Sequence, residues 1–218
     1  MNTSEIIIRA AAVGIGGTIV LDLYAFLLQR FFGVPATDWA MVGRWVGHMP
    51  RGRFIHQNIG KAAPVAGEHA VGWAVHYVIG IVYGLLLVGL WGAEWLRQPT
   101  FLPPMILALG LLVAPYFIMM PGMGLGVAGA KTPKPNMTRL KSVAGHSMFG
   151  LGMYGTALVV EACLGWRHHG YGMMGNGDWA WMMMFGPLMM ILFIATVVAL
   201  VAFVLRWLTG GGTHGSVQ

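Results

Sequence analysis

The chain has 218 residues, of which 57% are hydrophobic and 9% are charged, whereas a soluble domain carries about 25% charged residues. This composition excludes an ordinary soluble protein and predicts one compact bundle in a membrane. The formal net charge of +6 is explained by basic cytoplasmic loops without any nucleic-acid partner. Because Cys163 is the only cysteine, an internal disulfide is excluded as well.

Long apolar runs predict the membrane-crossing segments. A bilayer core of about 30 Å takes roughly 20 helical residues, and five stretches qualify by length and composition. They cover residues 8–28, 70–91, 101–128, 143–164 and 180–204. Since hydrocarbon offers no water to the backbone, each stretch should be helical. We therefore expect an all-α polytopic membrane bundle of about five transmembrane helices.

The third stretch is the least regular, because it contains four prolines. Glycines are frequent at its end, in MPGMGLGVAGA (120–130), and again in SMFGLGMYGTA (147–157) of the fourth stretch. Small residues let helices approach closely in membranes, so we expect these two stretches to be in contact. The glycines after Pro121 also fit an unwound helix end, which is tolerated where protein covers it or where it lines a cavity.

A short amphipathic pattern at about 38–50 follows the first stretch. Its apolar residues recur at helical spacing: Trp39, Val42, Trp45, Val46 and Met49. Thr37 or Asp38 can cap the start, and Pro50 ends the pattern. We expect a short interfacial helix on the cytoplasmic face, with its tryptophans at headgroup depth. Four basic residues are candidates for contacts with headgroup or substrate phosphates: Arg44, Arg51, Arg53 and Lys131.

The distribution of Lys and Arg predicts the orientation in the membrane. Ten follow the first, third and fifth stretches, and three lie on the other side. The positive-inside rule then places the N-terminus outside and the C-terminus in the cytoplasm, with a bacterial inner membrane as the natural location. Asp22 interrupts the first apolar run and no small-residue cleavage site follows it, so we expect this segment to be retained.

We expect two parts in the chain. Residues 1–165 form a four-helix membrane core with the interfacial helix, and the lipid bilayer is its main partner. Residues 166–218 form an extracytoplasmic loop rich in Met, His and Gly, the fifth transmembrane helix and a flexible tail.

Ionisable residues inside the predicted spans, or at their cytoplasmic ends, give the first candidate site. Five of them lie toward the cytoplasmic side, in or just before three different stretches: Asp22, Glu68, His69, His76 and His146. Charged groups are costly at this depth and often mark function. Acids and imidazoles at matched depth suit a proton site or a divalent transition metal such as zinc, iron or manganese. The alternative is that each side chain makes only an ordinary structural contact. No pair of histidines has the arrangement of an obvious haem site.

A second candidate site lies in the loop before the fifth stretch. It contains His168, His169, Met173 and Met174. Thioether and imidazole groups suit soft metals such as Cu(I). The alternative is that the methionines are flexible apolar filler at the membrane interface.

Four motifs in order resemble a known bacterial family. They are GRWVGHMPRGRF (43–54), GEHAVGWAVHY (67–77), PGMGLGVAGAKTPKPN (121–136) and GHSMFGLGMY (145–154). They are similar to multi-pass inner-membrane proteins that are catalogued only as a domain of unknown function, over roughly residues 5–160. The resemblance implies a small helical bundle and lends no catalytic residue.

Three functions remain open from the sequence. The first is a small transporter or channel for a metal ion or proton, which at this size would favour a homodimer. The second is a non-catalytic subunit or assembly factor of a larger membrane complex. The third is a membrane enzyme with a lipid-like substrate held by the basic residues above. The chain has no nucleophile elbow, zincin, P-loop or Rossmann motif, which favours a protein that is not an enzyme.

Overall fold

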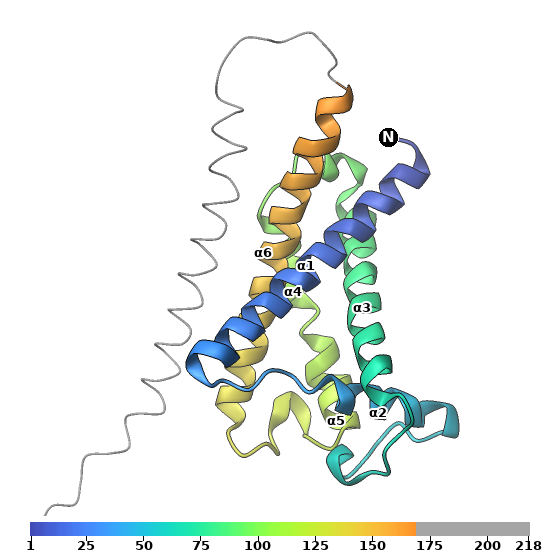
Figure 1. Ribbon diagram of the computed structural model, residues 1–218, viewed down its shortest axis with the longest axis vertical. Coiled ribbons are helices and arrows are strands. Elements are labelled where there is room, and N and C mark those ends of the chain that lie inside the picture. The colour runs from blue at the N-terminus through green and yellow to red at the C-terminus, as the bar shows by residue number, and fades with distance from the viewer. Residues whose placement is uncertain (169–218) are drawn as a thin grey trace, which may run out of the picture. The chain divides into compact units, whose positions relative to one another are not determined.

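The computed structural model describes residues 1–168 (Figure 1). This part of the chain consists of helices joined by short turns and contains no strand, which confirms the predicted all-α bundle. The predicted fifth span at 180–204 lies outside the described residues. The soft-metal loop at 168–174 lies outside the described side chains.

Four segments of the described residues are long and apolar enough to cross a membrane. They are Thr3–Phe32, Glu68–Trp91, Leu102–Gly122 and Pro135–Cys163. The first two are helices α1 (Thr3–Phe32) and α3 (Glu68–Trp91), and the last belongs to α6 (Pro135–His168). These segments confirm the first four predicted spans.

The chain divides into two compact units. The larger unit contains residues 1–22 and 37–170. The smaller unit includes residues 23–36, where α1 ends and Gly33 follows with a φ of 67°, a left-handed conformation typical of a residue that terminates a helix.

The third membrane segment is interrupted, as its prolines predict. Helix α4 spans Leu102–Gly110, a π-helical turn spans Pro115–Met119, and α5 spans Met120–Gly122. Proline removes a backbone donor and clashes with the preceding turn, so regular hydrogen bonding breaks down here. After α5 the chain passes Gly124 and Gly126, with φ angles of 85° and 75°, and a 3-10 turn at Val127–Gly129. The predicted unwound end is confirmed.

Close contact between the third and fourth segments is also confirmed. A Cβ atom on Gly150 of α6 would lie 3.1 Å from the carbonyl oxygen of Pro104 and 3.3 Å from Cβ of Ala108, both on α4. Leu107 of α4 and Phe149 of α6 belong to one buried core. Glycine therefore lets α6 approach the backbone of α4.

The predicted interfacial helix forms as α2 (Trp39–His48), and a 3-10 turn at Met49–Arg51 follows it. The Asp38 side chain accepts a hydrogen bond from the amide of Ala40 at 3.0 Å and caps the helix. The depth of both tryptophans in the membrane stays a prediction, but Trp45 packs inside the protein. This residue is 9% exposed in a core with Ile59 and Met123, because two loops cover that face of α2.

Glycines bring α2 onto the start of α3. A Cβ atom on Gly43 of α2 would overlap the carbonyl oxygen of Glu68, and one on Gly72 of α3 would overlap that of Trp39. Backbone therefore lies against backbone in this contact.

Two rows of small residues join α1 and α3. Along α1 the row is Ala10, Gly14 and Thr18, and along α3 it is Gly84 and Gly80. Added Cβ atoms on Gly14 and Gly84 would overlap the carbonyl oxygens of Gly80 and Ala10, so the helices touch along these rows in antiparallel order. The same four-residue steps lead to Asp22 on α1 and His76 on α3.

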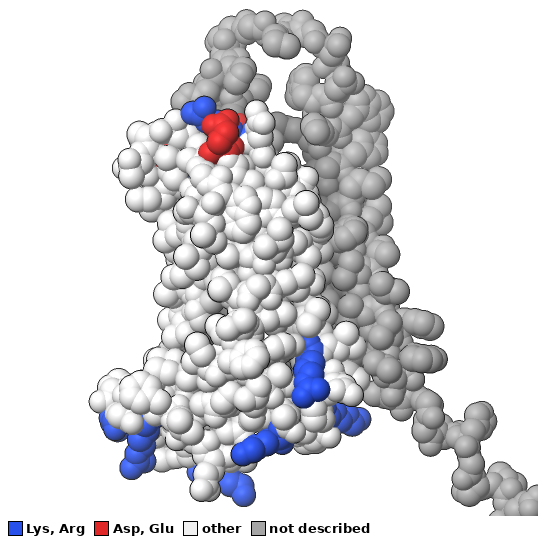
Figure 2. Space-filling model, turned by 180° about the vertical axis from the view of Figure 1, so that it is seen from behind, with Lys and Arg blue, Asp and Glu red and all other residues white. Residues whose placement is uncertain are grey.

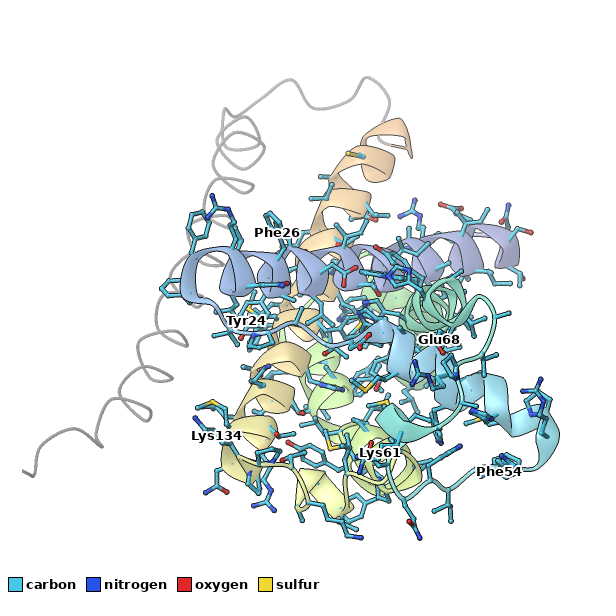
Figure 3. All side chains as sticks on the ribbon, turned by 60° about the horizontal axis from the view of Figure 1, so that its bottom comes forward. Tyr24, Phe26, Phe54, Lys61, Glu68 and Lys134 are labelled. Carbon is cyan, nitrogen blue, oxygen red and sulfur yellow. The ribbon has the colours of Figure 1, made fainter. Side chains whose placement is uncertain are left out.

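Basic residues of the first and third loops gather at one end of the larger unit. The His56 amide donates to the Gly122 carbonyl at 2.8 Å, and the Ile59 amide donates to that of Met123 at 3.0 Å, so the two loops are joined. Figure 2 shows a broad uncharged band between this basic end and the opposite end. Figure 3 labels Lys61 and Lys134 at the basic end.

Candidate functional site

Asp22 of α1 and His76 of α3 form a polar contact within the membrane-length part of the bundle. The Nε2 atom of His76 lies 2.9 Å from Oδ1 of Asp22. The hydroxyl of Tyr77 donates to Oδ2 of the same carboxylate at 3.0 Å. The His76 side chain is 7% exposed and that of Asp22 is 23% exposed. Two residues of α3 therefore hold both oxygens of an acid on α1.

The depth of the contact follows from its place on α3. His76 is eight residues beyond Glu68, where α3 begins, and a rise of 1.5 Å per residue places it about 12 Å along the helix. The small-residue rows of α1 and α3 hold the two backbones close at this level, so short side chains are enough to meet.

Tryptophans enclose the imidazole of His76. The ring of Trp39 on α2 stacks on it with centroids 3.8 Å apart and planes 24° apart. The ring of Trp73 presents an edge contact at 5.8 Å. An indole face is electron-rich and attracts a cation, so this stack is compatible with a protonated imidazole. Helices α1, α2 and α3 thus meet at His76.

This arrangement is suited to binding and releasing a proton. A carboxylate and an imidazole in contact share one proton, and whether they are charged or neutral depends on their surroundings. Burial disfavours an isolated charge on either group, so the two side chains are more stable in contact than apart. Below, the Asp22–His76 pair means these two side chains.

Glu68, another of the five predicted residues, does not contact the Asp22–His76 pair and has a different partner. Arg44 of α2 donates from Nε to Oε2 at 2.8 Å and from Nη2 to Oε1 at 2.6 Å. The amide of Val65 also donates to Oε2 at 2.9 Å. The bond to Glu68 raises the pKa of Arg44. The side chain of Arg44, predicted to contact phosphates, is thus engaged with Glu68 and fixes α2 to the start of α3.

His69 and His146 also have other partners. The indole nitrogen of Trp73 donates to Nε2 of His69 at 3.2 Å. The Nδ1 atom of His146 lies 2.9 Å from the Ser142 carbonyl, one turn earlier in the same helix. Among the residues that the structure describes, no group of three or more His, Cys, Asp and Glu could hold a metal ion. Of the five predicted residues, the structure thus brings Asp22 and His76 together and leaves Glu68, His69 and His146 with other partners.

The other predicted phosphate contacts are exposed. Arg51, Arg53 and Lys131 all lie at the basic end with their side chains at the surface. Their contact with headgroups stays a prediction.

Sequence reasoning missed the partners that complete the site. Tyr77 and Trp39 were not among the predicted site residues, although both contact the Asp22–His76 pair. The signal that could have found the geometry is the four-residue repeat, which reads Gly72, His76, Gly80 and Gly84 along α3. A second missed contact joins α1 to α6, where Nη1 of Arg9 lies 2.7 Å from Oε2 of Glu161.

Comparison with known proteins gives a family and no activity. Neither a curated protein nor a solved structure matches the chain. One family model, described as a protein of unknown function (DUF2938), matches residues 11–160 and so includes the Asp22–His76 pair. This match covers more than half of the 218 residues, and the chain belongs to the DUF2938 family.

Proposed function

We propose that the protein is a small transporter or channel of the bacterial inner membrane whose Asp22–His76 pair takes up and releases a proton during transport. The observation that carries this proposal is the 2.9 Å contact between Nε2 of His76 and Oδ1 of Asp22 across two membrane-length helices. Ionisable groups at this depth are costly and typically mark proton or ion pathways.

The surroundings of the pair support a proton role over a metal role. The pair supplies two ligand groups, and the described residues add no third acidic, cysteine or imidazole ligand. Tyr77 donates to the carboxylate and Trp39 stacks on the imidazole, so uncharged neighbours hold both groups of the pair in place.

The contact between α1 and α3 supports movement at the pair. Gly14 of α1 and Gly80 and Gly84 of α3 have no side chain that could interlock with the facing helix. A small displacement of one helix would separate Asp22 from His76 and leave each group to change its protonation. A chain of this size favours a homodimer as the working unit.

The orientation with the N-terminus outside places the basic end in the cytoplasm. Residues 44–61 and 131–141 carry eight of the thirteen Lys and Arg. With this orientation the pair is reached from the cytoplasmic side, about 12 Å along α3.

Infrared difference spectroscopy on the purified protein tests the proton role without a known substrate. Stepping the pH should change the C=O stretching band of a protonated carboxyl, and the Asp22→Asn variant should lose this band. The His76→Ala variant should shift it to another pH. His69→Ala is the matched control, because His69 is an exposed imidazole on the same helix, and it should leave the band unchanged.

Proton flux into liposomes under a potassium diffusion potential extends the test to transport. Asp22→Asn and His76→Ala should each lower the flux at least about tenfold, the effect of about 1.4 kcal/mol. The proposal fails if no carboxyl band responds to pH, or if both variants keep the full response. Either result would leave the pair as a structural contact between helices.

A further inference from the structure

A cavity at the basic end lies apart from the Asp22–His76 pair. Its volume is about 530 Å³, within the usual range of small-molecule sites. Eight residues line it: His48, Arg53, His56, Gln57, Asn58, Lys61, Ala62 and Ala63. Arg53, Gln57, Asn58 and Lys61 are exposed, so a ligand in solution or at the membrane surface can reach the cavity.

The two imidazoles of the cavity have buried nitrogen atoms without partners. His48 is 4% exposed, and its Nε2 atom lies 3.0 Å from the Ala63 carbonyl. A carbonyl only accepts, so Nε2 carries the hydrogen and Nδ1 is left without a partner. Both ring nitrogens of His56 are buried and lack partners as well. Buried polar atoms are nearly always hydrogen-bonded, and leaving them unpaired costs stability.

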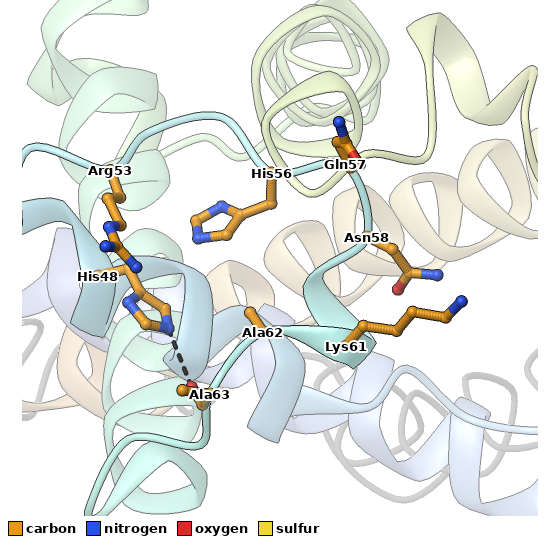
Figure 4. Close-up of a pocket in the computed structure, with 8 residues that line it drawn as sticks. All are labelled: His48, Arg53, His56, Gln57, Asn58, Lys61, Ala62 and Ala63. Atoms are coloured by element: carbon orange, nitrogen blue, oxygen red, sulfur yellow. Dashed lines mark hydrogen bonds between the residues drawn. The ribbon is translucent and has the colours of Figure 1, made fainter.

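The side chains that could hold a ligand lie together. The rings of His48 and His56 have centroids 5.1 Å apart. Figure 4 shows these rings and the guanidinium of Arg53 on one side of the cavity, while the Lys61 amine extends to the other side. Hydrogen bonds from His56 and Ile59 to the third loop hold this segment in place. The guanidinium of Arg53 and the imidazoles of His48 and His56 therefore form one wall of the cavity, where Arg53 and one ring nitrogen of His56 are free to donate.

The charge of the lining selects the kind of ligand. It includes one guanidinium, one ammonium, two imidazoles and two amides, and no carboxylate. A divalent metal would meet two histidines beside two cations, with no acid to balance its charge. An anion would instead meet the guanidinium fork, which suits phosphate geometry, and the N–H donor of His56.

We propose that this cavity binds an anion carrying a phosphate group. Arg53 and His56 hold the anion, and the ring of His48 lies beside that of His56. A phosphorylated small molecule and the phosphate headgroup of a lipid both carry this group, and the experiment below distinguishes the two sources. This proposal does not depend on the proton role of the Asp22–His76 pair, and the two are tested by different variants.

Titration calorimetry in a neutral, phosphate-free detergent tests the site and its ligand source. The probes are glycerol 3-phosphate and dioctanoyl phosphatidic acid. Both carry a glycerol phosphate, and only the second has acyl chains. We expect saturable binding that Arg53→Gln and His56→Ala each weaken by about tenfold or more. Equal affinities indicate a soluble ligand, and at least tenfold tighter binding of the lipid indicates a headgroup site.

Lys134→Gln is the matched control, because Lys134 is an exposed basic residue at the same end that does not line the cavity. It should change either affinity by less than about twofold. Thermal melting of each variant checks that the fold is kept; His56 has no ring hydrogen bond to lose. Absence of binding, or equal weakening by Lys134→Gln and Arg53→Gln, overturns the proposal. Binding of Zn²⁺ alone that is lost in His56→Ala would also overturn it, in favour of a metal.

Discussion

Gly80 of α3 lies so close to Thr18 of α1 that a Cβ atom at Gly80 would overlap the Thr18 hydroxyl oxygen. That hydroxyl donates to the carbonyl of Gly14 at 2.9 Å, one turn earlier in its own helix. Thr18 thus satisfies its donor within α1 and leaves room for the α3 backbone. The contact lies one turn from both members of the Asp22–His76 pair, so it sets the distance between them.

Gly80→Ala should weaken this contact and separate the pair. The added methyl group has no free space, and overpacking typically costs about 1–3 kcal/mol. Gly89→Ala on the same helix is the control, because nothing lies within 4 Å of its added Cβ atom. We expect thermal melting in detergent to show a lower midpoint for Gly80→Ala and no decrease for Gly89→Ala. Equal midpoints would mean that the two helices are not in close contact.

Arg44→Ala and Glu68→Ala should each loosen the attachment of α2 to α3. Either change leaves one charge of a bidentate pair without its partner. Removing both should cost no more than removing one, since the two residues act together. Comparing the melting midpoints of the two single variants and the double variant gives the coupling between Arg44 and Glu68. Arg51→Ala should leave the midpoint unchanged, and strictly additive effects of Arg44→Ala and Glu68→Ala would exclude a direct interaction.

The sequence was sufficient to predict the membrane segments, because every segment that crosses hydrocarbon has to be apolar and helical. Four predicted spans are confirmed, and the interfacial helix begins one residue from its predicted start. Composition, proline positions and capping residues are local signals, and they gave the helices and the unwound end after α5. These features do not depend on which helices are neighbours.

The candidate site was predicted only in part, because a depth along a helix does not say which way a side chain points. Asp22 and His76 were both predicted and do meet. Glu68 and His146 were predicted at similar depth, but their hydrogen bonds go to Arg44 and to the Ser142 carbonyl. The rows of small residues on α1 and α3 decide this pairing. The four-residue repeat is visible in each helix alone, but it does not say which helix lies against it.

Trp39→Ala should expose the imidazole of His76, whose side chain is 7% exposed beneath the stacked indole ring. We expect diethylpyrocarbonate to modify His76 several-fold faster in this variant, measured by mass spectrometry of digested protein, because access to the ring limits the reaction. Trp39→Phe keeps an aromatic ring and should stay near the parent rate. His69, which is already exposed, provides the internal control and should react equally in all three proteins. An unchanged rate for His76 in Trp39→Ala would mean that Trp39 does not cover it.

The orientation can be tested with single cysteines placed in two loops. In a Cys163→Ser background, Gln98→Cys lies between α3 and α4 and Lys134→Cys lies before α6. With the N-terminus outside, a membrane-impermeant maleimide should label the first variant in intact cells and the second only after the membrane is opened. One membrane segment, Leu102–Gly122, separates the two positions, so they should lie on opposite sides of the membrane and each serves as the control for the other. The reverse pattern would turn the basic end and its cavity outward, and the Asp22–His76 pair would then be reached from the periplasm.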